Sequence, residues 1–355
     1  MNYRCHSDGS IRTTKCAVAA VLVILLLSGC AGIGFSDVSP RIAEPVPTVP
    51  PLADGYFVAD DGAHLPLHVW LPAGRVKATI LALHGFNDYL NAFDGPAADW
   101  THDGIAVFAY DQRGFGKAPD RGFWPGTWRL DEDMANASRV VAARYPGVPH
   151  YILGESMGGA VAITGAAGSV GAERPVTDGL ILVAPAVWGR STMNLFERAA
   201  LWIAYHFVPS MSLTGRGLHI LASDNIPMLR ALARDPLVIK ATRVEAIEGL
   251  VNLMDRALAA APRLDRRLLL LYGQHDELIP REPVRLFIAA LPRATAPGRT
   301  IAWYPAGYHL LLRDLDAELV RTDVASWVLH PEAALPSGDG HGYEPLFATA
   351  ASTAP

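Results

Sequence analysis

Short apolar runs alternate with helix-like segments along most of this 355-residue chain. Six of the runs have the length and composition of buried strands: residues 78–83, 105–110, 151–154, 179–184, 267–272 and 300–304. Helical patterns separate most of them, at residues 130–144, 157–167, 283–291 and 315–328. Strands and helices that alternate in this way form a parallel sheet with helices on both faces. The functional sites of such a sheet lie beyond the carboxyl ends of its strands.

Two antiparallel strands are predicted at the amino-terminal side of this pattern. Residues 56–59 and 64–71 are joined across Asp61-Gly62, a typical hairpin turn, and they bring the predicted sheet to eight strands. With 50% hydrophobic and 18% charged side chains, the chain has enough apolar surface for a large core. We predict an α/β core, mostly parallel, made of residues 55–187 and 264–330.

One interval interrupts the alternation, because no strand pattern occurs between residues 188 and 263. Stretches such as residues 192–206 and 228–258 have helical patterns instead. We predict that residues 188–263 form a helical cap, inserted after the sixth strand and lying over the strand ends. Its large apolar side chains are expected to pack mostly inward as helix core, and some to line a substrate tunnel: Phe196, Leu201, Trp202, Tyr205, Phe207 and Met211.

The first thirty residues have the pattern of an export signal. Three basic residues precede an unbroken apolar run at residues 16–27, which is shorter than the roughly 20 residues that span a bilayer. The run ends in Leu27-Ser28-Gly29-Cys30, which resembles the bacterial lipobox. We predict a signal peptide at residues 1–29 and lipidation of Cys30. An ordinary secretory signal cleaved nearby and an uncleaved anchor are the alternatives.

Both ends of the mature chain are expected to lack regular structure. Cys5 and Cys16 would leave with the signal, so the exported domain would contain no disulfide. Residues 30–54 are Pro-rich and predict a semi-rigid tether, and residues 331–355 have the composition of a disordered tail. We predict a protein of the bacterial cell envelope, lipid-anchored to a membrane on the periplasmic side or at the cell surface.

Charge and motif content argue against several classes of function. The formal net charge is −5 and no stripe of Lys and Arg occurs, so nucleic acid is not an expected partner. No H-E-x-x-H, paired cysteines or dense His and carboxylate cluster indicates a metal, and no cofactor is expected. The Gly-rich loop at residues 111–116 lacks the Lys-Ser/Thr of a phosphate-binding loop. We expect Asp111 and Arg113 to form a buried pair there.

A candidate nucleophile follows the strand at residues 151–154. The strand runs directly into Gly154-Glu155-Ser156-Met157-Gly158, a G-x-S-x-G pattern. A serine on a sharp strand-to-helix turn needs small neighbours, so Gly154 and Gly158 are expected to support the turn. The same string also occurs as a plain Gly/Ser-rich turn. Here the apolar strand before it and the small-residue helix after it favour a nucleophile elbow with Ser156 exposed at the sheet edge.

A serine nucleophile needs a general base and an acid that orients the base. In folds of this kind the chain order is Ser, acid and His, with the acid and His each on a loop after a later strand. Asp276 follows the strand at residues 267–272 and is the expected acid, with Glu277 as the alternative. His309 follows the last strand and is the expected base, whereas His275 is interpreted as a loop residue.

The oxyanion formed in such a reaction needs two amide donors. One is expected from Met157, directly after the nucleophile, and the other from Phe86, in the loop after residues 78–83. Gly85 is expected to turn the backbone so that the Phe86 N–H faces the site. His84 is expected to brace this loop rather than to take part in the chemistry.

Five motifs together resemble the α/β-hydrolase superfamily, and within it the monoacylglycerol lipase and lysophospholipase group of serine-aminopeptidase-like hydrolases. They are H-G-F-N-D at residues 84–88, D-Q-R-G-F-G at 111–116, G-E-S-M-G-G at 154–159, G-Q-H-D at 273–276 and Y-H at 308–309. The resemblance covers residues 55–329. It implies hydrolysis of an amphiphilic ester, such as a monoacylglycerol or a lysophospholipid, through an acyl-enzyme on Ser156 without a cofactor.

The chain departs from this group near the expected position of the substrate head group. Members often have H-G-x-x-E-H and G-H-S-M-G-G, where this chain has Asp88-Tyr89 and Glu155. Their Asp-His-x-G-x-G-x-Ser loop is D-Q-R-G-F-G-K-A at residues 111–118 here. The head group therefore stays open. Acyl transfer or peptide cleavage by the same residues, and a non-catalytic lipid-binding envelope lipoprotein, are the alternative functions.

Overall fold

The computed structural model describes residues 52–53, 55–168, 173–215, 217, 220–293 and 298–338. The predicted signal peptide, Cys30 and nearly all of the predicted tether lie outside these residues, as do residues 339–355 of the predicted tail. Within the described part of the chain, no helix is long and apolar enough to cross a membrane. No group of His, Cys, Asp and Glu in the same residues is arranged to hold a metal ion.

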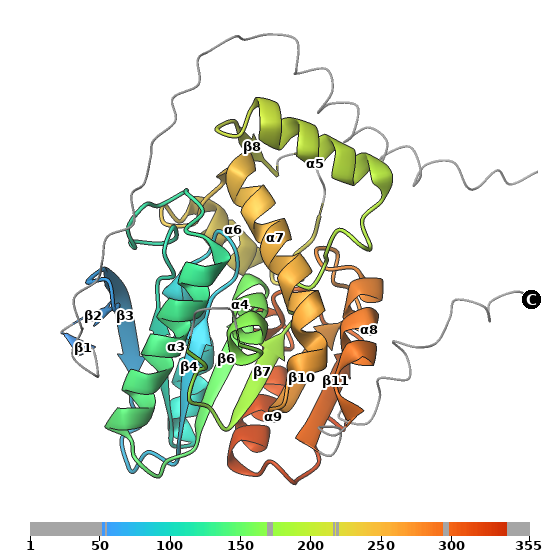
Figure 1. The fold of residues 1–355 in the computed structure, drawn as a ribbon. Coiled ribbons are helices and arrows are strands. Elements are labelled where there is room, and N and C mark those ends of the chain that lie inside the picture. The colour runs from blue at the N-terminus through green and yellow to red at the C-terminus, as the bar shows by residue number, and fades with distance from the viewer. Residues whose placement is uncertain are drawn as a thin grey trace, which may run out of the picture.

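The structure is built on one large sheet with the strand order β1-β2-β3-β5-β4-β6-β7-β10-β11 (Figure 1). Its strands are β1 (Leu52–Ala53), β2 (Tyr56–Val58), β3 (His64–Trp70), β4 (Ala78–Leu83), β5 (Ile105–Tyr110), β6 (His150–Glu155), β7 (Gly179–Val183), β10 (Arg267–Gly273) and β11 (Arg299–Tyr304). In this order neighbours from β5 to β11 are parallel, whereas β1, β2 and β3 pair antiparallel and β3 is antiparallel to β5. The predicted eight-stranded, mostly parallel sheet is confirmed. The short strand β1 extends its edge into the predicted tether.

Helices cover both faces of this sheet, as predicted (Figure 1). One face carries α3 (Thr127–Arg144), α4 (Met157–Ala166), α7 (Val244–Ala260) and α8 (Arg281–Ala290); the other carries η2 (Leu90–Phe93), α2 (Asp94–His102), η5 (Leu311–Arg313) and α9 (Ala317–Leu329). Every residue of β4, β5 and β6 is buried. A strand that is covered on both faces has an uninterrupted run of apolar residues, whereas a half-exposed strand alternates apolar and polar residues. The uninterrupted runs allowed these strands to be recognised in the sequence.

Residues 188–263, here called the insertion, connect β7 to β10. They contain α5 (Leu195–Phe207), β8 (Ser212–Thr214), α6 (Ile226–Arg234), β9 (Ala241–Arg243), α7 and η3 (Ala261–Arg263). The prediction of a purely helical segment is wrong here, because β8 and β9 form an antiparallel ribbon. The single helical stretch expected at residues 228–258 is also wrong. Asp235, the residue after α6, adopts an extended backbone with ψ 122°, as the proline that follows it favours.

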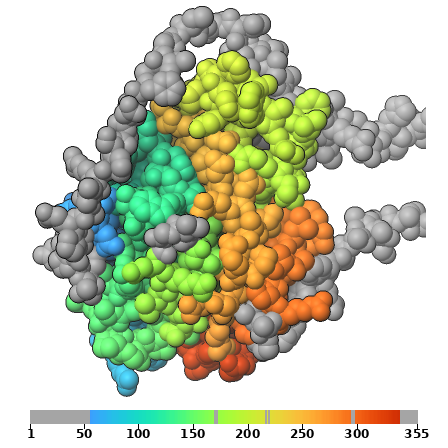
Figure 2. Space-filling model, viewed as in Figure 1, coloured from blue at the N-terminus to red at the C-terminus, as the bar shows by residue number. Residues whose placement is uncertain are grey.

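The helix α5 lies on the outside of the insertion beside α7 (Figures 1 and 2). Its start is determined locally by a capping box between Asn194 and Glu197. The expected inward packing of its large side chains holds for Leu201, which packs against the core, but is wrong for most of the others. Phe196, Trp202 and Phe207 are 77%, 58% and 71% exposed. Exposed apolar surface of this kind typically marks an interaction site.

The predicted disordered tail is ordered in its first part. Leu335 is buried in the core on the α9 side of the sheet. The Ser337 N–H donates to the Asp323 carboxylate at 2.9 Å, and Arg267 donates to the carbonyl of Pro331 at 3.0 Å. The prediction is therefore wrong for residues 331–338, where a buried leucine, these hydrogen bonds and an ion pair between Arg267 and Glu332 hold the segment on the core.

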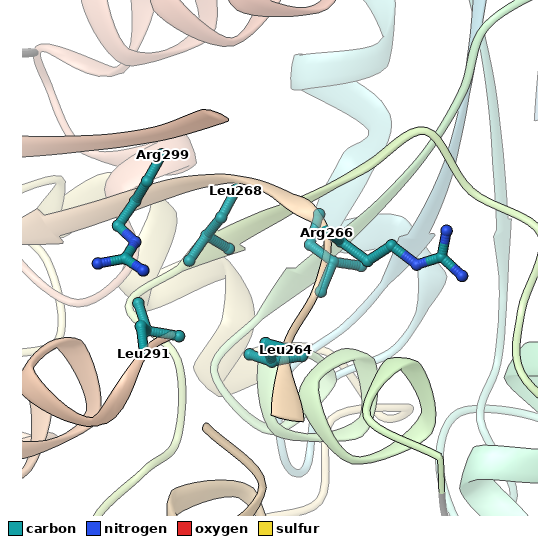
Figure 3. A pocket seen from close by; sticks show the side chains of 6 residues that line it. Leu264, Arg266, Leu268, Leu291 and Arg299 are labelled. Carbon is teal, nitrogen blue, oxygen red and sulfur yellow. The ribbon is translucent and has the colours of Figure 1, made fainter. Parts of the chain in front are cut away.

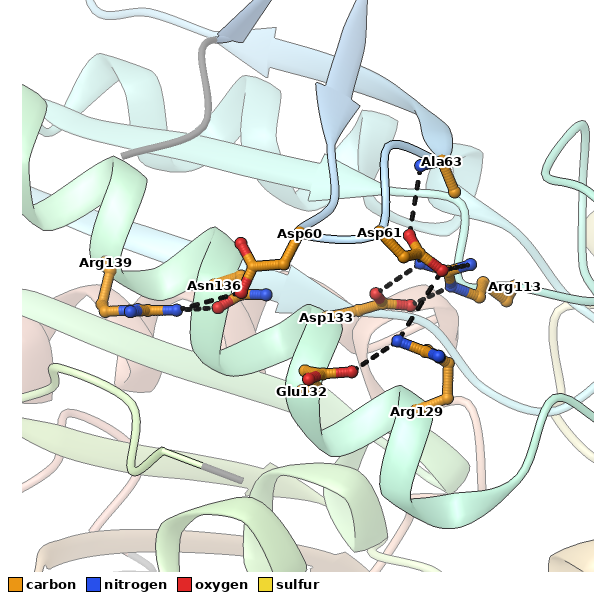
Figure 4. Close-up of polar contacts among 9 residues, drawn as sticks. All are labelled: Asp60, Asp61, Ala63, Arg113, Arg129, Glu132, Asp133, Asn136 and Arg139. Atoms are coloured by element: carbon orange, nitrogen blue, oxygen red, sulfur yellow. Dashed lines mark hydrogen bonds and ion pairs between the residues drawn. The ribbon is translucent and has the colours of Figure 1, made fainter. Parts of the chain in front are cut away.

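An ion-pair network fastens the β2–β3 turn to α3 (Figure 4). Arg113 lies between Asp61 in that turn and Asp133 on α3, with N–O distances of 2.7 and 2.6 Å. Burial raises the pKa of Asp133 to about 6, although Arg113 stabilises its carboxylate. The expected pair between Asp111 and Arg113 is not formed. Asp111 instead accepts hydrogen bonds from the backbone amides of Leu90, after β4, and Lys117, in its own loop.

Candidate active site

Ser156 lies at the turn where β6 runs into α4. Its backbone has φ 53° and ψ −113°, a left-handed conformation that is rare for a residue with a side chain. Its N–H donates to the carbonyl of Val183 at 2.9 Å, and its own carbonyl accepts from the N–H of Ala186 at 2.9 Å. The end of β7 and the residues after it therefore hold the turn. This is the geometry of a nucleophile elbow at the carboxyl end of a buried strand.

Two glycines make room for the turn. A Cβ atom on Gly154 would lie 2.3 Å from the carbonyl oxygen of Gly158. A Cβ atom on Gly158 would lie 2.1 Å from the carbonyl oxygen of Leu83 in β4. Both distances are far inside van der Waals contact, so neither position admits a side chain. The expected need for small neighbours around Ser156 thus has a steric cause, the close approach of α4 to β4 and β6.

The expected acid and base meet beyond the carboxyl ends of two adjacent strands. Asp276 follows β10 and His309 follows β11, and the Nδ1 of His309 lies 2.8 Å from Oδ2 of Asp276. Their side chains are 0% and 4% exposed. The other carboxylate oxygen accepts from the amides of Leu278 and Ile279 at 2.8 and 2.9 Å. The loop therefore holds Asp276 in one orientation, and Asp276 orients the imidazole.

Two effects of opposite sign act on the proton affinity of His309. Burial by itself lowers the pKa of the imidazole, but the charge and hydrogen bond of Asp276, aided by the charge of Glu155, raise it above its ordinary value. Since Nδ1 faces Asp276, Nε2 is the nitrogen available for proton transfer. Among the described residues no hydrogen bond joins His309 to Ser156, which is common in enzymes without bound substrate.

The loop after β4 lies against the elbow. A Cβ atom on Gly85 would lie 3.4 Å from the Cβ of Ser156, so the segment that includes Phe86 and the first turn of α4 are neighbours. Met157, the first residue of α4, is fully buried. The left-handed position of the loop is Asn87, with φ 67°. Asparagine tolerates this conformation better than other residues with side chains.

His84 braces this loop, as the sequence suggested. It is fully buried, with Nδ1 2.8 Å from the carbonyl of Gly85 and Nε2 accepting from the Gln112 N–H at 3.0 Å. Burial lowers the pKa of His84. The two contacts fit a neutral ring that carries its proton on Nδ1. His84 therefore joins the loops after β4 and β5.

The insertion binds the loop after β4. The side-chain amide of Asn87 donates to Thr242 Oγ1 at 2.7 Å, and the backbone carbonyl of Asn87 accepts from the N–H of Ile239 at 2.9 Å. Tyr89 donates its hydroxyl proton to Asp235 at 2.7 Å. Tyr89, which departs from the related motif, and Asn87, which has the left-handed backbone, therefore both contact residues 235–242 of the insertion.

The same insertion also binds the loops that carry the acid and the base. The Leu221 N–H donates to the carboxylate of Glu277 at 2.7 Å, and the Leu310 N–H donates to the carbonyl of Ala222 at 3.0 Å. Glu277, the alternative acid, therefore faces the insertion and not His309. Residues 221–242 of the insertion bridge the two sides of the candidate site.

A buried cluster of three charges lies behind the candidate residues. Glu155, directly before Ser156, pairs with Arg313 at 2.9 Å, and Arg313 pairs with Asp88 at 2.8 Å. Arg313 comes from η5, four residues after His309. In the sequence, Glu155 and Asp88 were noticeable only as departures from related motifs. Nothing in the sequence indicated Arg313 as their partner.

The crevice in Figure 3 is separate from this site. Its lining residues are Leu180, Leu264, Arg266, Leu268, Leu291 and Arg299. Leu180 and Leu268 are the second residues of β7 and β10, so the crevice lies at the opposite end of the sheet from Ser156. Its lining contains neither a nucleophile nor a carboxylate, and it contributes nothing to the candidate chemistry.

Comparison with known families shows which family the chain belongs to. A family model described as Hydrolase_4 (Serine aminopeptidase, S33) matches residues 74–316. The chain belongs to this family. The matched range of this Hydrolase_4 member contains the elbow, the Asp276–His309 pair and the entire insertion.

Several relatives of this Hydrolase_4 member are lipases. The monoglyceride lipase of Mus musculus is 30% identical over 289 residues, which cover 80% of this chain and 92% of the relative. The monoacylglycerol lipase of Mycolicibacterium smegmatis is 25% identical over 279 residues, which cover 77% and 95%. The solved structure of a soluble variant of monoglyceride lipase from Saccharomyces cerevisiae, in complex with a substrate analog, has a TM-score of 0.66 at 20% identity, covering 83% of this chain and 99% of that one. This likeness confirms the predicted α/β-hydrolase fold.

Proposed function

We propose that this chain is a serine hydrolase that cleaves an amphiphilic ester of the monoacylglycerol or lysophospholipid type through an acyl-enzyme on Ser156. The proposal rests on one observation above all, the strained Ser156 turn in a chain that also forms the buried Asp276–His309 pair. Carboxylic ester hydrolysis agrees with the names of its relatives, which are monoglyceride and monoacylglycerol lipases.

In the proposed mechanism, Nε2 of His309 accepts the hydroxyl proton of Ser156 while Oγ attacks the ester carbonyl carbon. The amides of Phe86 and Met157 donate hydrogen bonds to the resulting oxyanion. When this intermediate collapses, the alcohol leaves with the proton from His309. Water then attacks the acyl carbonyl carbon while Nε2 of His309 accepts a proton from it. Collapse of this second intermediate releases the carboxylic acid and returns the proton from His309 to Oγ of Ser156. Asp276 stays ionised and holds the imidazole in its reactive orientation.

A substrate series tests the proposed substrate class. We expect kcat/KM for long-chain monoacylglycerols and lysophospholipids to exceed that for acetyl esters by roughly tenfold or more, since each buried methylene adds discrimination in an apolar pocket. Amide substrates with the same acyl chain should be cleaved far more slowly. The assay measures the released fatty acid, with and without an added alcohol that would compete with water.

Three results would contradict the proposed class. Faster cleavage of an aminoacyl amide would favour a peptidase, and an excess of the new ester over free acid would favour an acyltransferase. Failure of Ser156 to react with a fluorophosphonate probe would favour a non-catalytic lipid-binding protein, because only an activated serine reacts.

We further propose that the protein acts at a membrane surface. The lipobox-like residues 27–30 and the exposed apolar side chains of α5 both support this. Replacement of Cys30 by serine is expected to move the protein to the soluble fraction or to leave it unprocessed, as seen in fractionated cells. Cys5→Ser is the matched control and should leave the protein with the membrane. Membrane retention of a normally processed Cys30→Ser protein would disprove the anchor.

A further inference from the structure

We propose that Glu155 acts as a second carboxylate for His309: its charge stabilises the imidazolium that forms when Ser156 loses its proton, and Arg313 holds it in position. The inference rests on the proposed function, since it concerns the base of that reaction. Glu155 acts through His309 and does not contact the substrate, so its role is that of a positioning and electrostatic residue. A glutamate at this position also departs from the histidine that is common in related motifs.

The position of Glu155 is determined by its neighbours on both sides. It is the last residue of β6 and is 1% exposed. One carboxylate oxygen lies 2.9 Å from Nη2 of Arg313, and the other is buried without a hydrogen bond among the described residues. Because Ser156 follows directly in the strained turn, the backbone of Glu155 cannot shift without moving the nucleophile.

The charge of the cluster is not balanced. Asp88 already pairs with Arg313 at 2.8 Å, and Glu155 adds a second carboxylate to the same guanidinium. With both carboxylates ionised, the cluster carries one net negative charge. A buried carboxylate is costly to desolvate, and one partner is enough to neutralise an arginine. If Arg313 served only to stabilise the fold, Asp88 alone would be a sufficient partner. The additional negative charge of Glu155 is therefore available to act on His309.

Charged groups on three elements act on His309. Asp276 comes from the loop after β10, Glu155 from the end of β6, and Arg313 from η5. Burial lowers the pKa of His309, whereas Asp276 and Glu155 raise it and Arg313 opposes them. Asp314, directly after η5, also interacts with the charge of His309. Loss of the Glu155 charge removes one of the two negative charges that raise the pKa of His309, so the pKa of the base is expected to fall.

The pH dependence of two variants separates this role from packing. In Glu155→Gln the shape and the contact to Arg313 are kept but the charge is lost. We expect the acid limb of its kcat/KM profile to move to lower pH, and kcat above that limb to fall by about 3- to 10-fold with KM unchanged. Glu155→Asp keeps the charge and loses part of the contact, and should retain an acid limb near that of the wild type. Glu282→Gln, at the exposed start of α8, is the control and should leave the profile unchanged.

The opposite order of effects would overturn the inference. If Glu155→Gln has the wild-type acid limb while Glu155→Asp is impaired, Glu155 serves only packing. Glu155 would also serve only packing if both variants have the wild-type pH profile of kcat/KM and differ only in their urea midpoint. Should Glu155→Gln fold poorly, the acid limb is read from the pH dependence of fluorophosphonate labelling of its folded fraction. Failure of the proposed function is distinct, because turnover would then survive Ser156→Ala.

Discussion

Replacement of Ser156 by alanine is expected to lower kcat/KM for ester hydrolysis by about 10⁴-fold or more, because the covalent route is lost while the binding surface is kept. Any activity that remains would come from substrate binding and from the oxyanion donors. Stability should not change. Alanine has the same Cβ atom as serine, so the cost of the backbone at φ 53° is the same in both proteins. Steady-state hydrolysis and urea unfolding measure these two expectations, and labelling by a fluorophosphonate probe should be lost.

The control for this variant is Ser212→Ala, which removes an exposed hydroxyl from β8 in the insertion. It should retain wild-type turnover and labelling. Undiminished hydrolysis by Ser156→Ala would reject the proposed nucleophile. A loss of activity together with a lower urea midpoint would instead indicate damage to the turn, and only a loss at constant stability supports the covalent role.

Replacement of Arg313 by methionine is expected to destabilise the protein by about 3–5 kcal/mol, the range found when one partner of a buried ion pair is removed. Methionine has similar length, so the loss comes mainly from the charge. Glu155 and Asp88 would face each other without the guanidinium that separates them. Burial already raises the pKa of Glu155, and Arg313 counteracts this. In the variant the pKa would rise further, so the loss of stability should be largest at neutral and alkaline pH and smaller where Glu155 takes up a proton.

Urea unfolding at several pH values measures this effect. Arg285→Met is the matched control, because Arg285 pairs with Glu282 on the exposed surface of α8, where removal of a charge should change the midpoint little. The double variant Arg313→Met/Glu155→Gln should recover much of the stability, since it removes the unpaired buried charge. A wild-type midpoint for Arg313→Met at neutral pH would show that the cluster does not stabilise the fold.

The strands and the order of the candidate residues were predictable because their signals are local. A strand buried on both faces is a continuous apolar run, and residues 78–83 and 105–110 appear in the sequence with the bounds that the structure has. The elbow is likewise defined within five residues. Asp276 and His309 could be named because each follows a recognisable strand, and the 2.8 Å contact between them agrees with that placement.

The charged contacts were not predictable because they join distant parts of the chain. Asp111 lies two positions from Arg113 in the sequence, yet Arg113 turns toward Asp61 and Asp133, which together satisfy its guanidinium. Arg313 had no local signal at all. The exposure of α5 was missed for a related reason. Amphipathic spacing identifies a helix, but it does not show whether the apolar face of that helix packs on the core or is exposed to solvent.

The contacts of residues 221–242 with both sides of Ser156 bear on how such hydrolases change during evolution. This segment is bonded to Glu277 and the His309 loop near its start, and to Asn87 and Tyr89 near its end. A segment exchanged from another hydrolase would bring different side chains to these bonds. A substitution in the insertion that is selected for a new substrate therefore also affects the loops around Ser156. Substitutions in residues 221–242 are therefore expected to change turnover together with substrate preference.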